Sequence, residues 1–288
     1  MRIGLALPQF GPLADAARIA PFAAAVEELG FDTVGVGDRL LTPLAPRDPY
    51  PGRQQPYPAE FTTGLDPIVT LSVAAAATTR IGLTTSTLNV PQFNPVLLGR
   101  ALTSLDVLSG GRLTVGVGLG WMRDEYEAAG VDWCTRGARL DETLDLWQAL
   151  WTTNPVRHEG TFHRLVPSVV DLRPVRPGGP ELLFAGLRPA AMRRVGERGA
   201  GWLAVQGLPE AYARSLWDAA RKAADDAGRD PDRLRRVLRV NVPPGVDPVA
   251  HVAAAAVDPY DEVLVDLTFC ARDVDEALEV AARIRRTA

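Results

Sequence analysis

Several features that mark other protein classes are missing from this chain of 288 residues. It has only two cysteines, Cys134 and Cys270, which are far apart and show no CxxC spacing. We expect two free thiols of a cytoplasmic protein, although this spacing leaves a structural disulfide open. Lys222 is the only lysine. We attribute that bias, together with the abundant alanine, to a GC-rich genome rather than to a mechanism.

Long apolar runs and clusters of positive charge are also missing. No uninterrupted apolar stretch reaches the length of a membrane span, and the start, MRIGLALPQF, lacks the shape of a signal peptide. The formal net charge is −4, and no run of lysine or arginine suggests a nucleic-acid surface. We therefore expect a cytoplasmic protein with no membrane or nucleic-acid partner.

Common catalytic motifs are absent as well. There is no GxSxG elbow of a hydrolase and no GxxxxGK[ST] phosphate loop of an NTPase. The three histidines, His158, His163 and His251, show no spacing typical of metal ligands. We expect them at the surface, and we predict no metal site.

What the sequence does contain is a regular alternation of strand and helix patterns without a long linker. Strands are predicted at Arg2–Leu7, Asp32–Gly37, Ile81–Leu88, Leu113–Val117, Glu181–Ala185, Trp202–Val205, Arg236–Val240 and Glu262–Leu267. Helices are predicted at Ala14–Leu29, Pro67–Thr78, from Pro95, and at Arg139–Trp151, Pro189–Arg198, Glu210–Ala227, Pro248–Ala255 and Val274–Arg285. Eight such units at this length favour one α/β domain over residues 1–288, a closed (β/α)₈ TIM barrel. A doubly wound open sheet is the alternative.

Two segments depart from the alternation. The segment 40–65 is rich in Pro, Gly, Tyr and Gln, which is typical of a functional loop or lid. The segment 154–174 is predicted to be irregular. Aromatic residues in the loops 40–65 and 131–174 suggest an apolar or aromatic substrate, although the same rings could pack a lid onto the barrel. These residues are Tyr50, Tyr57, Phe61, Trp133 and Phe162.

The glycine-rich end of the fourth strand resembles a dinucleotide fingerprint. Gly116, Gly118 and Gly120 have the right spacing, but Trp121 stands where the last glycine belongs, and no acidic residue follows a strand about 20 residues later. These two departures argue against a classical Rossmann site. The glycines either allow close packing or present backbone to a cofactor.

Active sites of (β/α)₈ barrels lie at the carboxyl ends of the strands. The candidates there are Gln9, Asp38, Arg39, 86–89, 118–124, 186–188 and Gln206. Several have simpler explanations: Asp38 and Arg39 could form a solvated turn, and Asp124, Glu125 and Glu127 could begin a solvated helix. The turn 186–188 could bind an anion through helix N–H groups and Arg188, or be an ordinary turn.

The segment NPVLLGRALTSLDVLSGGRLTVGVGLGW resembles the bacterial luciferase-like superfamily, and within it the branch of coenzyme F420-dependent oxidoreductases. The resemblance continues through WMRDEYEAAGVDW and RGARLDETLDLWQALW and recurs in ELLFAGLRPAAMRRVGERGAGWL. It implies a (β/α)₈ barrel with a flavin-like ring deep in its mouth, and relatives are commonly homodimers.

The resemblance also implies roles for individual residues. Asp38 matches an acid near the deazaflavin ring, and Ser86 and Thr87 match a place where the family often has a non-prolyl cis peptide. Cofactor-lining positions are matched by Asn89, Leu119, Gly120 and Trp121, and the phosphate-binding turn by Gly186, Leu187 and Arg188. On this basis Asp38 and Arg39 take polar roles near the ring, and Trp121 walls the substrate side. Asp124 is a candidate proton donor or a contact of the cofactor's side chain.

Four departures from the family pattern bear on these assignments. Arg39 replaces a histidine that can handle protons, and an arginine stays protonated. Leu119 replaces an arginine that contacts the FMN phosphate, which favours deazaflavin. Leu187 replaces the second glycine of the phosphate turn. The chain after Asn241 looks shortened, so the seventh unit is in question.

The leading hypothesis is an oxidoreductase that moves hydride between reduced coenzyme F420 and a small organic substrate. An FMN-dependent monooxygenase of the same fold is the second, and oxygen dependence separates the two. The third is a barrel that binds a flavin or deazaflavin without turnover. The sequence does not identify the substrate.

Overall fold

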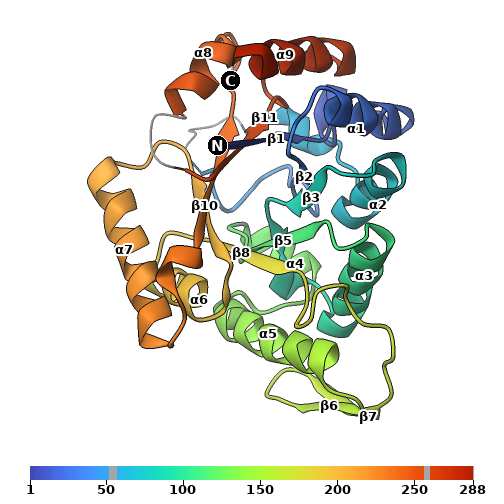
Figure 1. Ribbon diagram of the computed structural model, residues 1–288, viewed down its shortest axis with the longest axis vertical. Coiled ribbons are helices and arrows are strands. Elements are labelled where there is room, and N and C mark those ends of the chain that lie inside the picture. The colour runs from blue at the N-terminus through green and yellow to red at the C-terminus, as the bar shows by residue number, and fades with distance from the viewer. Residues whose placement is uncertain (52–56, 256–259, 288) are drawn as a thin grey trace.

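Eight parallel strands close into a barrel. The computed structural model describes residues 1–51, 57–255 and 260–287. Each strand pairs with its neighbours in parallel, and the pairings of β1 with β11 and of β3 with β5 close the ring (Figure 1). The strands are β1 (Arg2–Ala6), β2 (Thr33–Val36), β3 (Gly82–Thr85), β5 (Leu113–Gly118), β8 (Glu181–Ala185), β9 (Gly201–Val205), β10 (Arg235–Asn241) and β11 (Glu262–Asp266). The predicted (β/α)₈ barrel is confirmed, and the open-sheet alternative is excluded.

A layer of helices surrounds the barrel (Figure 1). The helices are α1 (Ile19–Glu28), α2 (Pro67–Ala77), α3 (Pro95–Leu108), α5 (Arg136–Thr152), α6 (Pro189–Arg198), α7 (Glu210–Asp226), α8 (Pro248–Ala255) and α9 (Val274–Thr287). A short helix, α4 (Arg123–Ala128), follows β5, and the two-residue strand β4 (Leu88–Asn89) pairs with the end of β5. The seventh unit, β10 with α8, is therefore present, although α8 has only eight residues.

Local signals explain several helix boundaries. The side chain of Asp66 accepts a hydrogen bond from the Val69 amide at the start of α2, and Asn94 caps α3 in the same way. Each cap is followed by a proline at the first helical position, as the sequence predicts. Gly30 takes a φ of 85° after α1.

Two predictions about local structure were wrong. The first helix begins at Ile19 rather than Ala14, which places Pro21 in its first turn, where a missing N–H costs nothing. The segment 154–174 was expected to be irregular but contains a hairpin, β6 (Val156–Glu159) and β7 (Arg164–Ser168). Its turn is held by Glu142 of α5, whose carboxylate accepts hydrogen bonds from the amides of 161–163. This contact joins residues that are about 20 positions apart, so the local sequence of 154–174 does not predict it.

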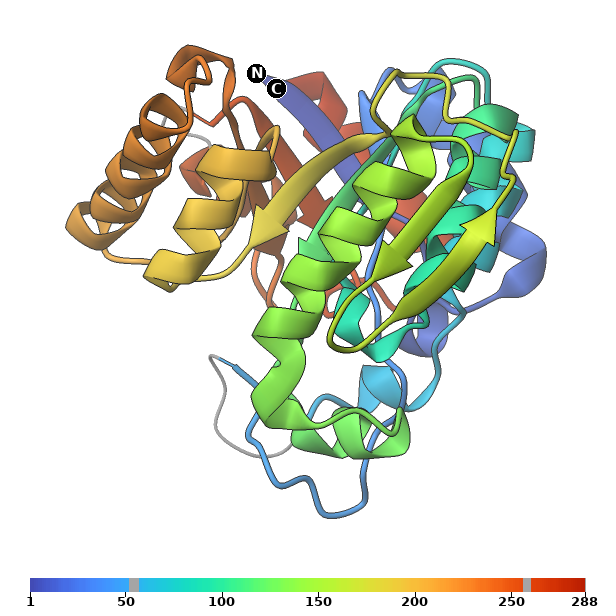
Figure 2. The ribbon, with the colours of Figure 1, turned by 90° about the horizontal axis from the view of Figure 1, so that it is seen from below.

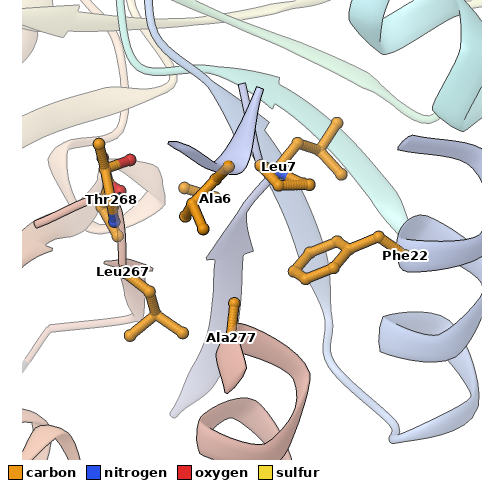
Figure 3. A pocket seen from close by; sticks show the side chains of 9 residues that line it. Ala6, Leu7, Phe22, Leu267, Thr268 and Ala277 are labelled. Atoms are coloured by element: carbon orange, nitrogen blue, oxygen red, sulfur yellow. Dashed lines mark hydrogen bonds between the residues drawn. The ribbon is translucent and has the colours of Figure 1, made fainter. Parts of the chain in front are cut away.

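The core lies mainly between the barrel and its helices, and a smaller cluster fills the barrel. Figure 3 shows the seam where Leu7 and Phe22 meet Leu267 and Ala277, between β1 and helices α1 and α9. These side chains leave no volume that a water molecule could enter. Inside the barrel, Leu183, Leu203 and Val237 pack together. The barrel is therefore a filled core, and ligands are restricted to its mouth.

The glycines of β5 allow a neighbouring strand to approach. A Cβ on Gly116 would lie 1.9 Å from the carbonyl oxygen of Thr85, and one on Gly118 would lie 2.4 Å from the hydroxyl of Thr87. The motif that resembles a dinucleotide fingerprint thus serves close packing of the segment after β3. The two explanations that the sequence left open are resolved in favour of packing at these two positions.

The Gly116→Ala substitution is expected to destabilise the protein by about 3 kcal/mol or more, because a backbone atom must move to admit the methyl group. Gly137→Ala is the control, since its Cβ would meet nothing nearer than 3.6 Å. We expect the control to be neutral or slightly stabilising, because alanine favours helix over glycine. Urea unfolding measures both, and equal stability of the two variants would contradict the assigned role of Gly116.

Candidate functional site

Asp38, which follows β2, meets Asn89 of β4, the short strand that follows β3. The Asn89 amide donates to Oδ2 of Asp38 at 2.7 Å, and the Asn89 side-chain amide donates to the Asp38 carbonyl at 3.3 Å. Burial raises the pKa of Asp38 to about 6, although the hydrogen bond from Asn89 opposes this shift. A carboxyl group with such a pKa exchanges protons near neutral pH, as a general acid or base must.

The segment between β3 and β4 runs beside this pair. The Ser86–Thr87 peptide bond is cis, as the resemblance predicts. The Ser86 side chain is buried, and its Oγ has no hydrogen-bond partner among the described residues. Buried polar groups are nearly always paired in proteins, so this hydroxyl is available to a polar atom of a ligand. The arrangement fits a flavin-like ring lying against Ser86 and Thr87.

Arg39 pairs with Glu125 rather than with solvent. Its guanidinium donates to Oε2 of Glu125 at 2.7 Å, and the two side chains are 8% and 0% exposed. The Leu40 amide also donates to Glu125, at 2.9 Å. Burial raises the pKa of Glu125, whereas Arg39 lowers it, and the short contact is that of an ion pair. The simpler explanation that the sequence left open, a solvated first turn of α4, does not hold for Glu125.

The same arginine supports an aromatic cover. Its guanidinium lies over the ring of Trp121, 4.8 Å from the centroid, and it donates to the Tyr57 hydroxyl at 3.3 Å. Trp121 contacts Tyr50 and Tyr57, with centroid distances of 5.6 and 6.0 Å, and Phe61 contacts both tyrosines. We call these four rings the aromatic cover.

Most of the aromatic cover comes from the segment 40–65, of which residues 52–56 lie outside the described structure. The other two rings that the sequence nominated lie elsewhere: Trp133 packs on Tyr126, and Phe162 lies under Arg139. The hairpin of 156–168 runs along α5, whereas α4 lies at the opposite end of the molecule from the chain termini (Figure 2). The rings of the segment 40–65 gather around Trp121, whereas Trp133 and Phe162 lie elsewhere. The segment 40–65 is therefore the better candidate for shaping a substrate pocket.

Asp124 lies in a surface ion pair. It accepts hydrogen bonds from the backbone and side chain of Arg47 at 3.0 and 2.7 Å. The Arg47 contacts lower the pKa of Asp124, which therefore stays ionised near neutral pH. This geometry does not support the role of proton donor suggested by the sequence, and Asp38 is the better candidate.

The turn between β8 and α6 holds Gly186, Leu187 and Arg188. Gly186 has a φ of 134°, and a Cβ there would meet Ala191 at 2.7 Å, so glycine is required. The Leu187 carbonyl accepts from the Tyr212 hydroxyl at 2.7 Å. Arg188 is exposed at the start of α6, with its side chain free of any cap contact to that helix. A phosphate there would meet Arg188 and the amides of the turn.

Other positions nominated by the sequence contribute structure. Gly120 has a φ of 67° and lies against Asn89, and Leu119 is partly buried against the core. Gln9 is buried and bridges strand ends through the Gly37 amide and carbonyl. Gln206 contacts His251 at 2.9 Å, and both line a separate cavity of about 540 Å³ between α7 and α8.

Sequence reasoning did not nominate three charged side chains near the site, of which Glu125 and Asp266 are buried and Arg239 is 17% exposed. Besides Glu125, Arg239 of β10 and Asp266 of β11 form an ion pair at the carboxyl ends of their strands. A charge next to buried apolar residues of a strand is the signal that could have identified them: Arg239 lies between Leu238 and Val240, and Asp266 follows Val265 at the end of β11.

Other site classes were searched within the described residues. No group of three or more His, Cys, Asp or Glu side chains among them could hold a metal ion. Cys134 and Cys270 are both free thiols. None of the helices in the described ranges is long and apolar enough to cross a membrane.

The family model of luciferase-like monooxygenases matches residues 1–286. The chain belongs to the luciferase-like monooxygenase family. Among curated relatives, an uncharacterised protein of Mycobacterium bovis is 30% identical over 275 residues, which cover 92% of this chain and 93% of the relative. The F420-dependent glucose-6-phosphate dehydrogenase of Kribbella flavida is 30% identical over 247 residues, covering 84% of this chain and 68% of that enzyme.

Solved structures of other proteins share the fold of this chain. Monooxygenase RslO1 from Streptomyces bottropensis has a TM-score of 0.77 and 23% identity, covering 100% of this chain and 97% of that one. An F420-dependent secondary alcohol dehydrogenase has a TM-score of 0.69 and 20% identity, covering 99% and 83%. A type II Baeyer–Villiger monooxygenase from Pseudomonas putida, solved in complex with FMN, has a TM-score of 0.68 and 18% identity, covering 86% and 69%. The names of these relatives and neighbours thus include F420-dependent oxidoreductases and monooxygenases, one of them bound to FMN.

Proposed function

We propose that this luciferase-like protein transfers hydride between reduced coenzyme F420 and a small organic substrate. The observation that carries the proposal is the carboxyl group of Asp38, held by the Asn89 amide at the barrel mouth with a pKa raised to about 6 by burial. Substrate reduction by hydride also needs a proton, and this group can supply it. The bound cofactor would supply the hydride chemistry, and the protein orients it and manages the proton.

Each part of the mouth has a defined task in this proposal. Ser86, Thr87, Asn89 and Gly120 line the ring, and Leu119 lines the cofactor toward its phosphate. The turn of Gly186, Leu187 and Arg188 receives the phosphate. Trp121 and the rest of the aromatic cover exclude water from the reacting atoms and present an apolar surface to the substrate.

Arg39 takes no proton in this proposal. Its guanidinium pairs with the buried carboxylate of Glu125, and an arginine is not an ordinary general base. Its contacts with Trp121 and Tyr57 make it a positioning residue for the aromatic cover.

A parallel fluorescence titration with coenzyme F420 and with FMN tests the choice of cofactor. We expect coenzyme F420 to bind at least about tenfold more tightly, because Leu119 offers no cation where flavin-binding relatives hold the FMN phosphate. Protein that binds neither cofactor would refute the proposal. Tighter binding of FMN together with oxygen consumption would instead indicate a monooxygenase, and binding of coenzyme F420 without hydride transfer to any of a broad substrate panel would indicate a binding protein.

A further inference from the structure

We propose that Arg239 contacts the bound cofactor from the floor of the barrel mouth and, with Ser86, recognises the acceptor-bearing edge of its ring. The ligand class is a planar ring with a pyrimidinedione edge, which flavins and 5-deazaflavins share. This assignment rests on the proposed function and adds to it a residue that the sequence did not nominate.

The strand pattern places Arg239 inside the barrel. Side chains alternate between the two faces of a strand, and Val237 belongs to the cluster that fills the interior. Arg239, two residues further toward the carboxyl end of β10, therefore also faces inward, one layer nearer the mouth. In the same way, Asp266 lies two residues beyond Leu264 in β11 and faces inward with it. The Leu264 side chain packs against Gly4 and Gly35.

The guanidinium of Arg239 spans the mouth. It donates to the Asp266 carboxylate, to Oδ1 of Asn241 at 3.0 Å, and to the carbonyl oxygen of Ser86. Strands β11, β1 and β2 separate β10 from β3 in the sheet, so the contact with Ser86 crosses the barrel. It joins Arg239 to the segment against which the ring is proposed to lie.

The ion pair of Arg239 and Asp266 is not needed for the stability of the barrel. Barrel interiors are normally filled by branched apolar side chains, and such side chains often stabilise a protein as well as a buried ion pair does. The side chains of Arg239 and Asp266 are only 17% and 4% exposed. The cost of burying them is understandable if the guanidinium also serves a ligand.

Two unused polar groups point to that ligand. Arginine has five N–H groups in a planar fork, and acceptors among the described residues account for three of them. The Ser86 hydroxyl is buried and unpaired in the same part of the structure. A planar fork beside a hydroxyl matches a ring edge with adjacent oxygen and nitrogen acceptors.

Ring binding can be tested apart from phosphate binding. The purified protein and its R239Q variant are titrated with coenzyme F420, with FMN, and with lumiflavin, which keeps the isoalloxazine ring of a flavin but lacks the ribityl chain and phosphate. We expect R239Q to weaken binding of lumiflavin, and of whichever cofactor the protein prefers, at least tenfold. Arg188→Ala is the matched control: it should weaken binding of the phosphate-bearing cofactor and leave lumiflavin binding unchanged.

R239Q leaves Asp266 without its charged partner and could therefore misfold. A second variant distinguishes loss of ring binding from misfolding. The double variant R239M/D266L removes both charges and should retain the wild-type circular dichroism spectrum while losing ring binding to the same extent. Wild-type affinity for lumiflavin and the cofactor in either folded variant would overturn the role of Arg239 and leave the proposed function standing. Wild-type protein that binds none of the three ligands would overturn the proposed function, and this assignment with it.

Discussion

Replacing Asp38 by asparagine lowers turnover by about 10²- to 10⁴-fold, the usual contribution of a positioned general acid or base. The amide has the shape of the carboxyl group and still offers an oxygen to the Asn89 amide, so the local structure should persist. It cannot exchange a proton near neutral pH. The loss should appear in kcat, with cofactor affinity changed little, in a steady-state assay of hydride transfer.

The role of Asp38 also predicts in which direction the rate of hydride transfer changes with pH. Burial raises the pKa of Asp38 to about 6, so its protonated form dominates below that pH. When the substrate is reduced, the carboxyl group must donate a proton, and the rate should fall as the pH rises through about 6. In the reverse direction the carboxylate accepts the proton, and the rate should fall as the pH drops through about 6. Asp38→Asn should remove this limb of the profile.

Asp124→Asn is the control for Asp38. Its carboxylate is held by Arg47 near the surface, and we expect little change in kcat or in the pH profile. If Asp124→Asn abolished turnover while Asp38→Asn did not, the assignment of the proton-exchanging group would have to be reversed.

The stability of the protein should also depend on Asp38. Because the folded-state pKa lies above the ordinary value of 3.8, the folded protein binds this proton more tightly than the unfolded chain does. The stabilising contribution is complete below about pH 4 and is lost as the pH rises through about 6. The difference in unfolding free energy between wild type and Asp38→Asn should change over that interval and be constant outside it.

Replacing Glu125 by alanine is expected to cost about 3–5 kcal/mol of unfolding free energy. The substitution leaves the guanidinium of Arg39, only 8% exposed, without its charged partner, and leaves the Leu40 amide without its acceptor. The aromatic cover should loosen as well, because Trp121 and Tyr57 both contact Arg39. Urea unfolding measures the stability, and tryptophan fluorescence reports on the cover.

Glu127→Ala is a control on the same helix. Glu127 also pairs with an arginine, Arg47, but the two side chains are 73% and 48% exposed. Exposed ion pairs contribute at most about 1 kcal/mol, so this variant should remain close to wild type. Equal losses in Glu125→Ala and Glu127→Ala would show that burial of the Arg39–Glu125 pair has no special effect.

The alternation of elements could be predicted because its signals are local. The strand Glu181–Ala185 and the helices Pro189–Arg198 and Pro248–Ala255 have the predicted bounds, which polar and proline residues mark. Where local signals conflicted, the prediction failed. Apolar residues extended the first predicted helix back to Ala14, but Pro21 requires a later start.

The candidate site was predictable only in part. The carboxyl ends of parallel strands meet at one mouth, which is why Asp38, Ser86, Thr87 and Asn89 could be grouped from the sequence. The partners of those residues could not be predicted. Nothing near Glu125 in the sequence indicates that Arg39, 86 residues away, neutralises it, and a carboxylate in a first turn is normally solvated.

The sequence by itself determined the eight strand–helix units, the order of the strand ends and the resemblance that identified the family. Tertiary structure decided which charges are buried and paired: Arg39 with Glu125, and Arg239 with Asp266. It also decided that Asp124 belongs to the surface and that Tyr50, Tyr57 and Phe61 gather with Trp121. The physical reason is the sequence distance over which each interaction acts. Helix caps and apolar periodicity involve residues that are near one another in the chain. Desolvation and ion pairing depend on which distant residues the closed barrel brings together.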